Sequence, residues 1–198
     1  MLNRDRDIAT PHLEPGEHLL AAAPADLAPG IPHPPAHLLT PRRPGGLEQR
    51  LGRPLTALRR AYAAVNPVSA AVGAVEDRLA DAVPDTLWHG EGMAGGWQSA
   101  AGRFVLRMHD EGAHGSGTLA VTDRRLLLVV DRASAWQLLT ERHELHWAAP
   151  RHTVTLHRNA TGVLQRGRID LHFADGSWAA VTTPRPAAAD ELAAAAHR

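Results

Sequence analysis

Histidine is the residue type here with the widest range of chemistry, and 13 of the 198 residues are histidines. The densest group lies in the second half of the chain and consists of His143, His146, His152, His157 and His172. Imidazole is a good zinc ligand, so this group raises the alternative of a histidine-metal-dependent hydrolase. In His143-Glu144-Leu145-His146 the histidines are three apart, whereas a helical zinc motif needs them four apart around a glutamate. We therefore predict no metal site and interpret these residues as surface histidines. A sheet site on outward faces of neighbouring strands, formed by His157 and His172, remains the alternative.

Other catalytic signatures are missing from the sequence. The chain has no cysteine, which excludes disulfides, thiolate catalysis and cysteine zinc sites. None of its serines stands in a Gly-x-Ser-x-Gly elbow. The glycine-rich residues 90–96 lack the Gly-Lys-Ser/Thr ending of a phosphate-binding loop. The sequence therefore predicts a protein that is not an enzyme, with no catalytic residue and no cofactor.

Arginine supplies every one of the 21 positive charges, and 21 aspartates and glutamates balance them. A nucleic-acid partner usually leaves a net basic footprint, so no nucleic acid is expected. Local clusters remain: Arg103 and Arg107 share one face of an expected strand, while Arg124 and Arg125 occupy a turn. These four arginines are the predicted binding residues for acidic lipid or peptide. Alternatively, they protect an edge strand against aggregation.

The elements that must position these residues begin with an N-terminal segment, residues 1–45, that is rich in proline. Proline lacks a backbone donor and restricts the residue before it, which argues against a continuous helix and against a central strand. We therefore predict an irregular arm. A short strand at residues 17–23 is the regular element expected within it.

Residues 46–84 show helical periodicity on both sides of an Asn66-Pro67 break, which predicts a helical hairpin or elbow. The apolar face of the first part consists of Leu51, Leu55, Leu58 and Tyr62. This face either packs on the rest of the domain or acts as an interaction helix on a membrane surface or a second copy. Pairing with a second copy would make the protein an oligomeric structural subunit that assembles through residues 46–84.

Residues 85–198 switch to the alternating pattern that is typical of half-buried strands. The predicted strands are residues 97–109, 118–121, 125–130, 136–140, 152–158, 168–173 and 178–183, followed by a helix at residues 187–197. The second hairpin strand, at residues 125–130, is predicted to be buried on both faces because it is continuously apolar. The dipeptide Asp175-Gly176 predicts a hairpin turn that sets Phe173 near Trp178.

The stretch Gly117-Thr118-Leu119-Ala120-Val121-Thr122-Asp123-Arg124-Arg125-Leu126-Leu127-Leu128-Val129 resembles the strand-turn-strand signature of bacterial pleckstrin-homology-like (PH-like) and GRAM-like domains. The resemblance covers roughly residues 97–197, and Pro15-Gly16-Glu17-His18-Leu19-Leu20 is similar to the opening of such domains. It implies a mainly β, α+β fold: a seven-strand antiparallel barrel with a C-terminal capping helix. Eukaryotic relatives often bind phosphoinositides through lysines and arginines in the loop after the first strand. The matching residues 110–117 are acidic, which departs from that pattern.

The resemblance implies a non-catalytic protein-interaction or peripheral-membrane adaptor module. A protein partner or a homo-oligomer is expected, with weak contact to anionic lipid as a further option. No signal-like apolar stretch follows the N-terminus, and no apolar run approaches the roughly 20 residues of a membrane span. The expected location is therefore cytoplasmic, with peripheral membrane contact as the variant. The sequence does not identify the partner.

Overall fold

The computed structural model describes residues 3–39, 90–109, 116–131, 143–160 and 165–198. These residues, Gly90 excepted, belong to one of the two units into which the chain divides, the unit of residues 1–40 and 91–198. The predicted interaction face of Leu51, Leu55, Leu58 and Tyr62 lies outside the described residues, as does the predicted strand at residues 136–140.

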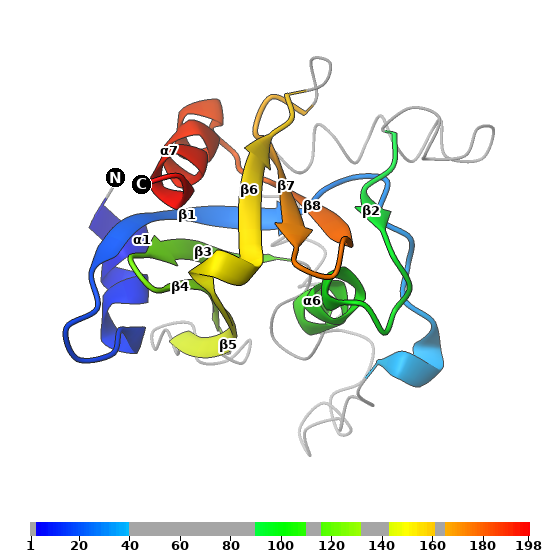
Figure 1. Ribbon diagram of the computed structural model, residues 1–198, viewed down its shortest axis with the longest axis horizontal. Coiled ribbons are helices and arrows are strands. Elements are labelled where there is room, and N and C mark those ends of the chain that lie inside the picture. Colours follow the sequence, from blue (N-terminus) through cyan, green and yellow to red (C-terminus); the bar gives the residue numbers. More distant parts are fainter. Residues whose placement is uncertain (1–2, 40–89, 110–115, 132–142, 161–164) are drawn as a thin grey trace, which may run out of the picture. The chain divides into compact units, whose positions relative to one another are not determined.

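An antiparallel sheet of eight strands dominates the fold (Figure 1). The strands are β1 (Leu19–Leu27), β2 (Met93–Ala94), β3 (Ser116–Thr122), β4 (Arg125–Asp131), β5 (His143–Pro150), β6 (Val154–Arg158), β7 (Arg168–Phe173) and β8 (Trp178–Thr182). The described helices are α1 (Asn3–Ala9), α6 (Ala100–His109) and α7 (Pro186–Ala196), with short 3-10 turns η1 (Thr10–His12), η2 (Ala36–Leu38) and η3 (Arg151–Thr153). The predicted mainly β, α+β class is confirmed.

The sheet is open rather than closed into a barrel. Its order is β5-β4-β3-β1-β8-β7-β6, with β2 added against β8. Among the described residues, β5 pairs only with β4 and β6 only with β7, so these two strands are the edges. The chain nevertheless passes from β5 through the three-residue turn η3 directly into β6. Because so short a turn joins the two edges, the sheet has to curve around its core.

Both predicted hairpins are present. Thr122 ends β3 and Arg125 starts β4, and residues 126–130 of β4 are all buried, as expected of a continuously apolar strand. Gly176 adopts a positive φ of 82° in the turn between β7 and β8, a conformation that glycine takes without strain. The register differs from the prediction in one respect, because His172 rather than Phe173 stands opposite Trp178. Phe173 points into the core on the other face of the strand.

The largest error concerns residues 97–109, which were predicted to form a strand and instead contain helix α6. Phe104 and Met108 are four residues apart, so they fit both an alternating and a helical pattern. Val105 decides between the two, because it is fully buried on the same side as Phe104, while Leu106 is only partly buried. Burial of Ala101, Phe104, Val105 and Met108 follows the three- and four-residue spacing of a helix.

The β7–β8 turn caps the start of α6. A helix N-terminus leaves its first N–H groups without intrahelical partners. Here the Ala100 N–H donates to Asp175 Oδ2 at 2.7 Å and the Ala101 N–H donates to Ser177 Oγ at 3.0 Å. The Gly102 N–H donates to Ser99 Oγ at 3.1 Å. The bond from Ala100 is the main reason that the pKa of Asp175 is lowered. The helix is therefore held in place by a turn about 75 residues further along the chain.

Strand β1 overturns the prediction that no central strand occurs in the proline-rich segment. It lies between β3 and β8, and it is longer than the short strand expected at residues 17–23. Its ladder with β3 runs from Leu19 to Asp26, whereas its ladder with β8 includes only Asp26 and Leu27. Over most of its length β1 is therefore paired on one side alone. Pro24 lies in this singly paired part, where a missing N–H is tolerated.

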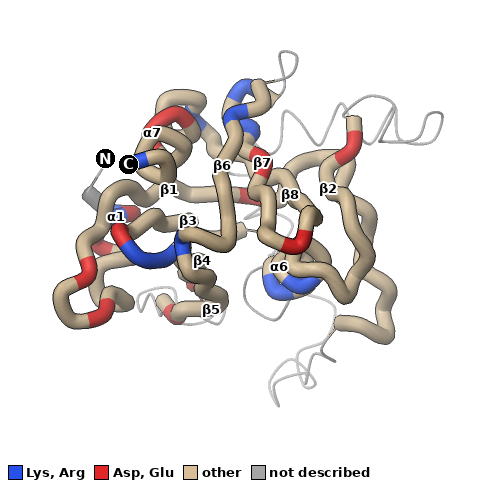
Figure 2. The backbone as a smooth tube through the Cα atoms, in the orientation of Figure 1, with Lys and Arg blue, Asp and Glu red and all other residues tan. Residues whose placement is uncertain are grey.

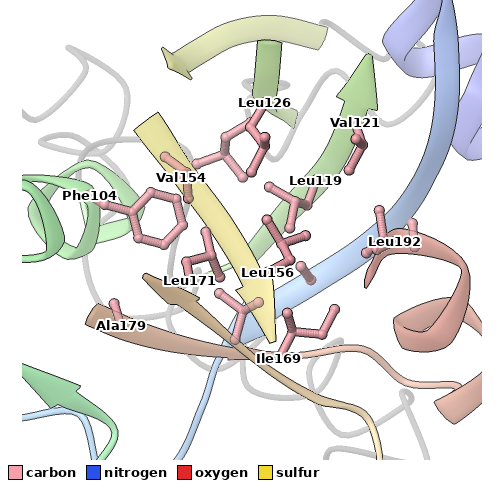
Figure 3. Close-up of a cluster of buried hydrophobic side chains, with 14 of the residues drawn as sticks. Phe104, Leu119, Val121, Leu126, Val154, Leu156, Ile169, Leu171, Ala179 and Leu192 are labelled. Carbon is pink, nitrogen blue, oxygen red and sulfur yellow. The ribbon is translucent and has the colours of Figure 1, made fainter. Parts of the chain in front are cut away.

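The core lies inside the curve of the sheet, between the two halves of the strand order (Figure 3). Leu119 and Leu126 come from the β3–β4 half, while Leu156, Ile169 and Leu171 come from the β6–β7 half. Helix α7, the predicted C-terminal helix, packs against β1, β3, β6 and β7 and adds Leu192 to the same cluster. Helix α6 adds Phe104, whose ring lies 5.0 Å from that of Trp147 and 6.1 Å from that of Phe173.

Candidate functional site

The four predicted binding arginines do not form one site. Arg103 and Arg107 are exposed and lie one turn apart on α6, so the prediction that they share a strand face is wrong. Arg124 and Arg125 lie at the β3–β4 turn, as predicted. In Figure 2 the basic positions of α6 and those of the β3–β4 turn form two separate blue segments. Any anion bound by one pair would therefore not be shared with the other.

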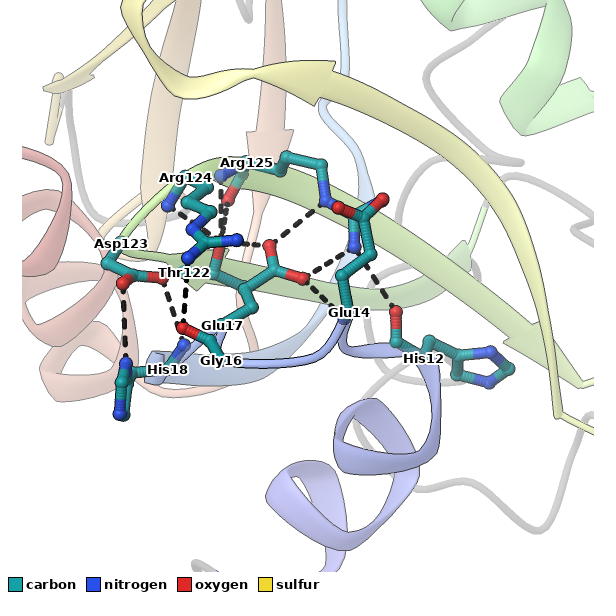
Figure 4. Close-up of polar contacts among 9 residues, drawn as sticks. All are labelled: His12, Glu14, Gly16, Glu17, His18, Thr122, Asp123, Arg124 and Arg125. Atoms are coloured by element: carbon teal, nitrogen blue, oxygen red, sulfur yellow. Dashed lines mark hydrogen bonds and ion pairs between the residues drawn. The ribbon is translucent and has the colours of Figure 1, made fainter.

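Arg125 is engaged by a buried carboxylate from the N-terminal segment (Figure 4). The Glu17 side chain is 0% exposed, and its two oxygens accept hydrogen bonds from Arg125 Nε at 3.0 Å and Arg125 Nη2 at 2.5 Å. Thr122 Oγ1 donates to the same carboxylate at 2.6 Å, and the Glu14 N–H donates to it at 2.8 Å. Glu14 adds an exposed ion pair to Arg125 Nη1 at 2.9 Å. We call Glu17, Thr122 and Arg125 the Glu17 clamp.

The clamp strongly favours the ionised form of its carboxylate. The hydrogen bonds from Arg125 are the largest cause that lowers the pKa of Glu17 from its ordinary value of 4.5 to about 2, although burial opposes the shift. A bidentate guanidinium–carboxylate pair is among the stronger polar contacts in proteins. Arg125 is only 18% exposed and already has its acceptors, so the clamp holds the N-terminal segment onto the β3–β4 hairpin rather than binding an external anion.

A second set of bonds ties the same two segments together at the surface. The His18 N–H donates to Asp123 Oδ1 at 2.9 Å, which is the main reason that the pKa of Asp123 is lowered. Arg124 Nη2 donates to the Gly16 carbonyl at 3.2 Å. Both sequence segments were singled out for their resemblance to PH-like domains, but nothing in the sequence indicated that they contact each other. The identity of Glu17 as a buried partner of Arg125 was therefore missed.

Two of the five clustered histidines do come together, as the alternative sheet site required. His157 on β6 and His172 on β7 lie on the outward face of the sheet, with ring centroids 4.8 Å apart. His197, which follows α7, lies 6.2 Å from the His157 ring. The remaining members are elsewhere: His143 and His146 on β5, and His152 in η3. His146 Nε2 is 2.9 Å from the Arg107 carbonyl, to which it donates.

Trp178 extends this group across a third strand. It stands directly opposite His172 in the β7–β8 ladder, and the two rings stack at 6.1 Å with an angle of 22° between their planes. We call His157, His172, Trp178 and His197 the imidazole face. His157 and His197 are exposed, whereas His172 and Trp178 are partly buried. The sequence placed Trp178 near Phe173 and not among the site residues, because its place beside His172 depends on the hairpin register.

A buried ion pair contacts Trp178 of the imidazole face. The Arg168 guanidinium lies 5.7 Å from the centre of the Trp178 ring, which is cation–π geometry. Its Nε donates to Asp170 Oδ1 at 2.7 Å, and these two side chains are only 4% and 7% exposed. Gln165 Oε1 and the Glu91 carbonyl accept further hydrogen bonds from Arg168, at 2.8 Å and 2.7 Å. The orientation of Trp178 is thus set by a cation that has little freedom to move.

No group of three or more histidine, aspartate or glutamate side chains among the described residues is arranged to hold a metal ion. None of the helices in this part of the chain is both long and apolar enough to cross a membrane. Comparison with models of known protein families and with curated proteins finds no match to this chain.

Proposed function

We propose that the chain is a non-catalytic protein-interaction module of PH-like type that binds its partner through the imidazole face. The seven-strand path β5-β4-β3-β1-β8-β7-β6, curved around one core, supports the PH-like part of this proposal, as does the packing of α7 against β1, β3, β6 and β7. The open sheet departs from the closed β-barrel that the sequence resemblance implied, whereas the seven-strand path and the C-terminal helix agree with it. The proposed PH-like identification rests on these two features.

The observation that carries the proposed binding role is the continuous set of contacts from Arg168 through Trp178 and His172 to His157. Tryptophan contributes strongly to protein interfaces when its position is preorganised, because little entropy is then lost on binding. Trp178 contacts a buried cation and stacks on the His172 ring, while part of its surface remains accessible. A rigid, partly exposed aromatic side chain beside exposed imidazoles is the pattern expected of a recognition surface.

The charges of this face favour an acidic partner. The outward positions of β6, β7 and β8 contain one carboxylate, Asp170, and Arg168 neutralises it. A carboxylate from a partner would therefore meet imidazole rings on strands whose one outward carboxylate is already paired. We therefore expect a protein partner that presents acidic side chains to His157 and His172.

Peripheral membrane binding through Arg103 and Arg107 is the second candidate, because both side chains are exposed on one helix. A basic residue near an anionic membrane contributes about 1 kcal/mol, so the pair would supply about 2 kcal/mol. That corresponds to roughly a thirtyfold enrichment at the surface, which is too little for stable attachment. The small free energy expected for membrane binding therefore favours the protein partner.

Affinity capture from the native host with matched variants tests the proposal. The bait proteins are the wild type, the double variant Trp178→Ala/His172→Ala and the double variant Arg103→Ala/Arg107→Ala, all in buffer with a chelator. We expect one partner to be retained by the wild type and the arginine variant and lost by the Trp178/His172 variant. Retention by all three baits would contradict the imidazole face as the binding surface. Co-sedimentation with acidic liposomes that disappears in the arginine variant would support the membrane candidate instead.

A further inference from the structure

The contact between His157 and His172 has a second chemical consequence, which does not require a protein partner. Imidazole nitrogen is a preferred ligand of borderline divalent ions such as Zn²⁺ and Ni²⁺. Two imidazoles that reach one ion from neighbouring strands bind it more tightly than either does alone, since the sheet has already brought them together. Such a pair leaves the other coordination positions to water.

The distance between the two rings suits a shared ion. A zinc–nitrogen bond is about 2.0 to 2.1 Å long, so a zinc ion lies about 3.2 Å from the centre of each imidazole ring that binds it. Two rings that bind one ion at a tetrahedral angle therefore have their centres about 5 Å apart. The His157 and His172 ring centroids are 4.8 Å apart. The His197 ring, at 6.2 Å from His157, is further away and does not complete a group of three.

A shared ion requires one nitrogen of each ring to face it, and rotation of an imidazole ring can provide this orientation. Their planes lie at 79° to each other. Rotation about the last side-chain torsion of histidine meets only a broad, shallow energy well. His157 is exposed. Within the described part of the chain, the two rings make one hydrogen-bond contact, which is weak: His157 Nε2 lies 3.3 Å from Thr155 Oγ1. His157 is therefore the ring that turns.

His172 is the ring that stays. It stacks on Trp178, which lies over Arg168, and Arg168 is fixed by Asp170, Gln165 and the Glu91 carbonyl. Metal sites gain affinity when residues behind the ligands hold them in orientation. The positive charge of Arg168 does not oppose a bound cation, because Asp170 pairs with it at 2.7 Å. One ordered and one adjustable ligand thus lie on adjacent strands.

We infer that His157 and His172 form a two-imidazole site for a borderline divalent metal ion such as Zn²⁺ or Ni²⁺. His197 is not a ligand in this site. The site is independent of the proposed protein partner, although it lies on the same face.

Titration of the intact chain with Zn²⁺ and with Ni²⁺, followed by calorimetry and by imidazole nitrogen NMR, tests this inference. We expect one ion to bind per chain and the resonances of His157 and His172 to shift. The variants His157→Ala and His172→Ala should each lose at least about tenfold in affinity, because even the loss of a supporting residue behind a ligand costs that much. The matched control His152→Ala removes an exposed histidine from η3 and should leave the affinity unchanged.

Three results would overturn the site: no binding, equal affinity in all variants, or loss of binding in His152→Ala with retention in His172→Ala. Circular dichroism of each variant shows that the fold is retained; both histidines point away from the core, so their removal should not unfold the chain. The titration contains no partner and the capture experiment contains a chelator. Failure of the metal site is therefore distinguishable from failure of the proposed interaction face.

Discussion

Two buried carboxylates each hold an arginine in this protein, and they hold different kinds of structure. Glu17 joins Arg125 across a sequence separation of 108 residues, whereas Asp170 joins Arg168 from two positions away on the same strand. The first pair connects an N-terminal segment to a distant hairpin. The second orders one face of a single strand and, through Trp178, the imidazole face. The same kind of buried carboxylate–guanidinium pair therefore stabilises the fold in one region and orders a surface in the other.

Removal of the charge of Glu17 is the most direct test of the Glu17–Arg125 pair. Glu17→Gln leaves a largely buried guanidinium without its main counter-charge, and breaking a buried pair in this way typically costs about 3 kcal/mol or more. We expect a loss of about 3 kcal/mol in the free energy of unfolding, measured by urea denaturation. The matched control is Glu14→Gln, which removes the 59% exposed partner of the same arginine and should cost less than about 1 kcal/mol. Equal losses in the two variants would show that Glu17 is not the anchor.

The pH dependence of the free energy of unfolding provides a second test of the Glu17 clamp. The pKa of Glu17 is lowered from 4.5 to about 2 in the folded chain, so the folded state holds its proton less tightly than the unfolded state. The clamp's contribution is therefore complete above pH 4.5 and is lost as the pH falls toward 2. Linkage over this window amounts to about 3 kcal/mol.

The measurement is the free energy of unfolding from pH 6 to about pH 2, compared between wild type and Glu17→Gln. The difference between the two proteins should shrink as the pH falls. Other shifted carboxylates, Asp123 and Asp175 among them, contribute to both proteins and cancel in the difference. A difference that stays constant with pH would mean that Glu17 is not ionised in the folded clamp.

Removal of the charge of Asp170 should destabilise the fold by a similar amount. In Asp170→Asn, the 4% exposed Arg168 keeps Gln165 Oε1 and the Glu91 carbonyl as acceptors but loses its counter-charge, so we expect a loss of about 3 kcal/mol in the free energy of unfolding. The Trp178 indole resonance should shift, because Trp178 rests on the Arg168 cation. Asp190→Asn, at an exposed carboxylate paired with Arg158, is the control and should change neither. An unshifted Trp178 resonance in Asp170→Asn would remove the distinction between the two pairs.

The smallest expected effect on stability belongs to Trp178. Trp178→Leu removes the cation–π contact and the stacking partner of His172, at a cost of less than about 1 kcal/mol because the ring is partly exposed. Its main result should be a loss of order in the His172 ring, seen as a change in that imidazole's NMR signals. Trp178→Phe keeps an aromatic surface and should preserve most of the order. An unaltered His172 signal in Trp178→Leu would show that the ring is positioned by the backbone alone.

The sequence predicted an element correctly where the residues that contact each other in the fold are also close in the sequence. The β3–β4 and β7–β8 hairpins and helix α7 were predicted because turn residues and side-chain periodicity act over a few positions. Helix α6 was not, since Phe104 and Met108 satisfy two periods. The docking that decides between them involves Trp147, Phe173 and a cap from Asp175, all distant in the chain.

Long-range pairing also explains the errors at the candidate sites. Arg124 and Arg125 were correctly placed in a turn, but their partners Gly16 and Glu17 lie more than 100 residues earlier. The outward pairing of His157 and His172 was available as an alternative, because strand alternation assigns faces. Trp178 was missed because its position beside His172 depends on the register of the hairpin, which is one residue away from the predicted one.

The sequence by itself determined the mainly β composition of the second half, both tight hairpins and the terminal helix, because turn chemistry and hydrophobic period are local properties. Only the tertiary structure decided that a proline-containing strand lies in the middle of the sheet, that residues 100–109 form a helix, and that Glu17 neutralises Arg125. Each of these depends on which distant segments exclude water from one another. Burial of that kind is a property of the folded chain, and no short stretch of residues specifies it.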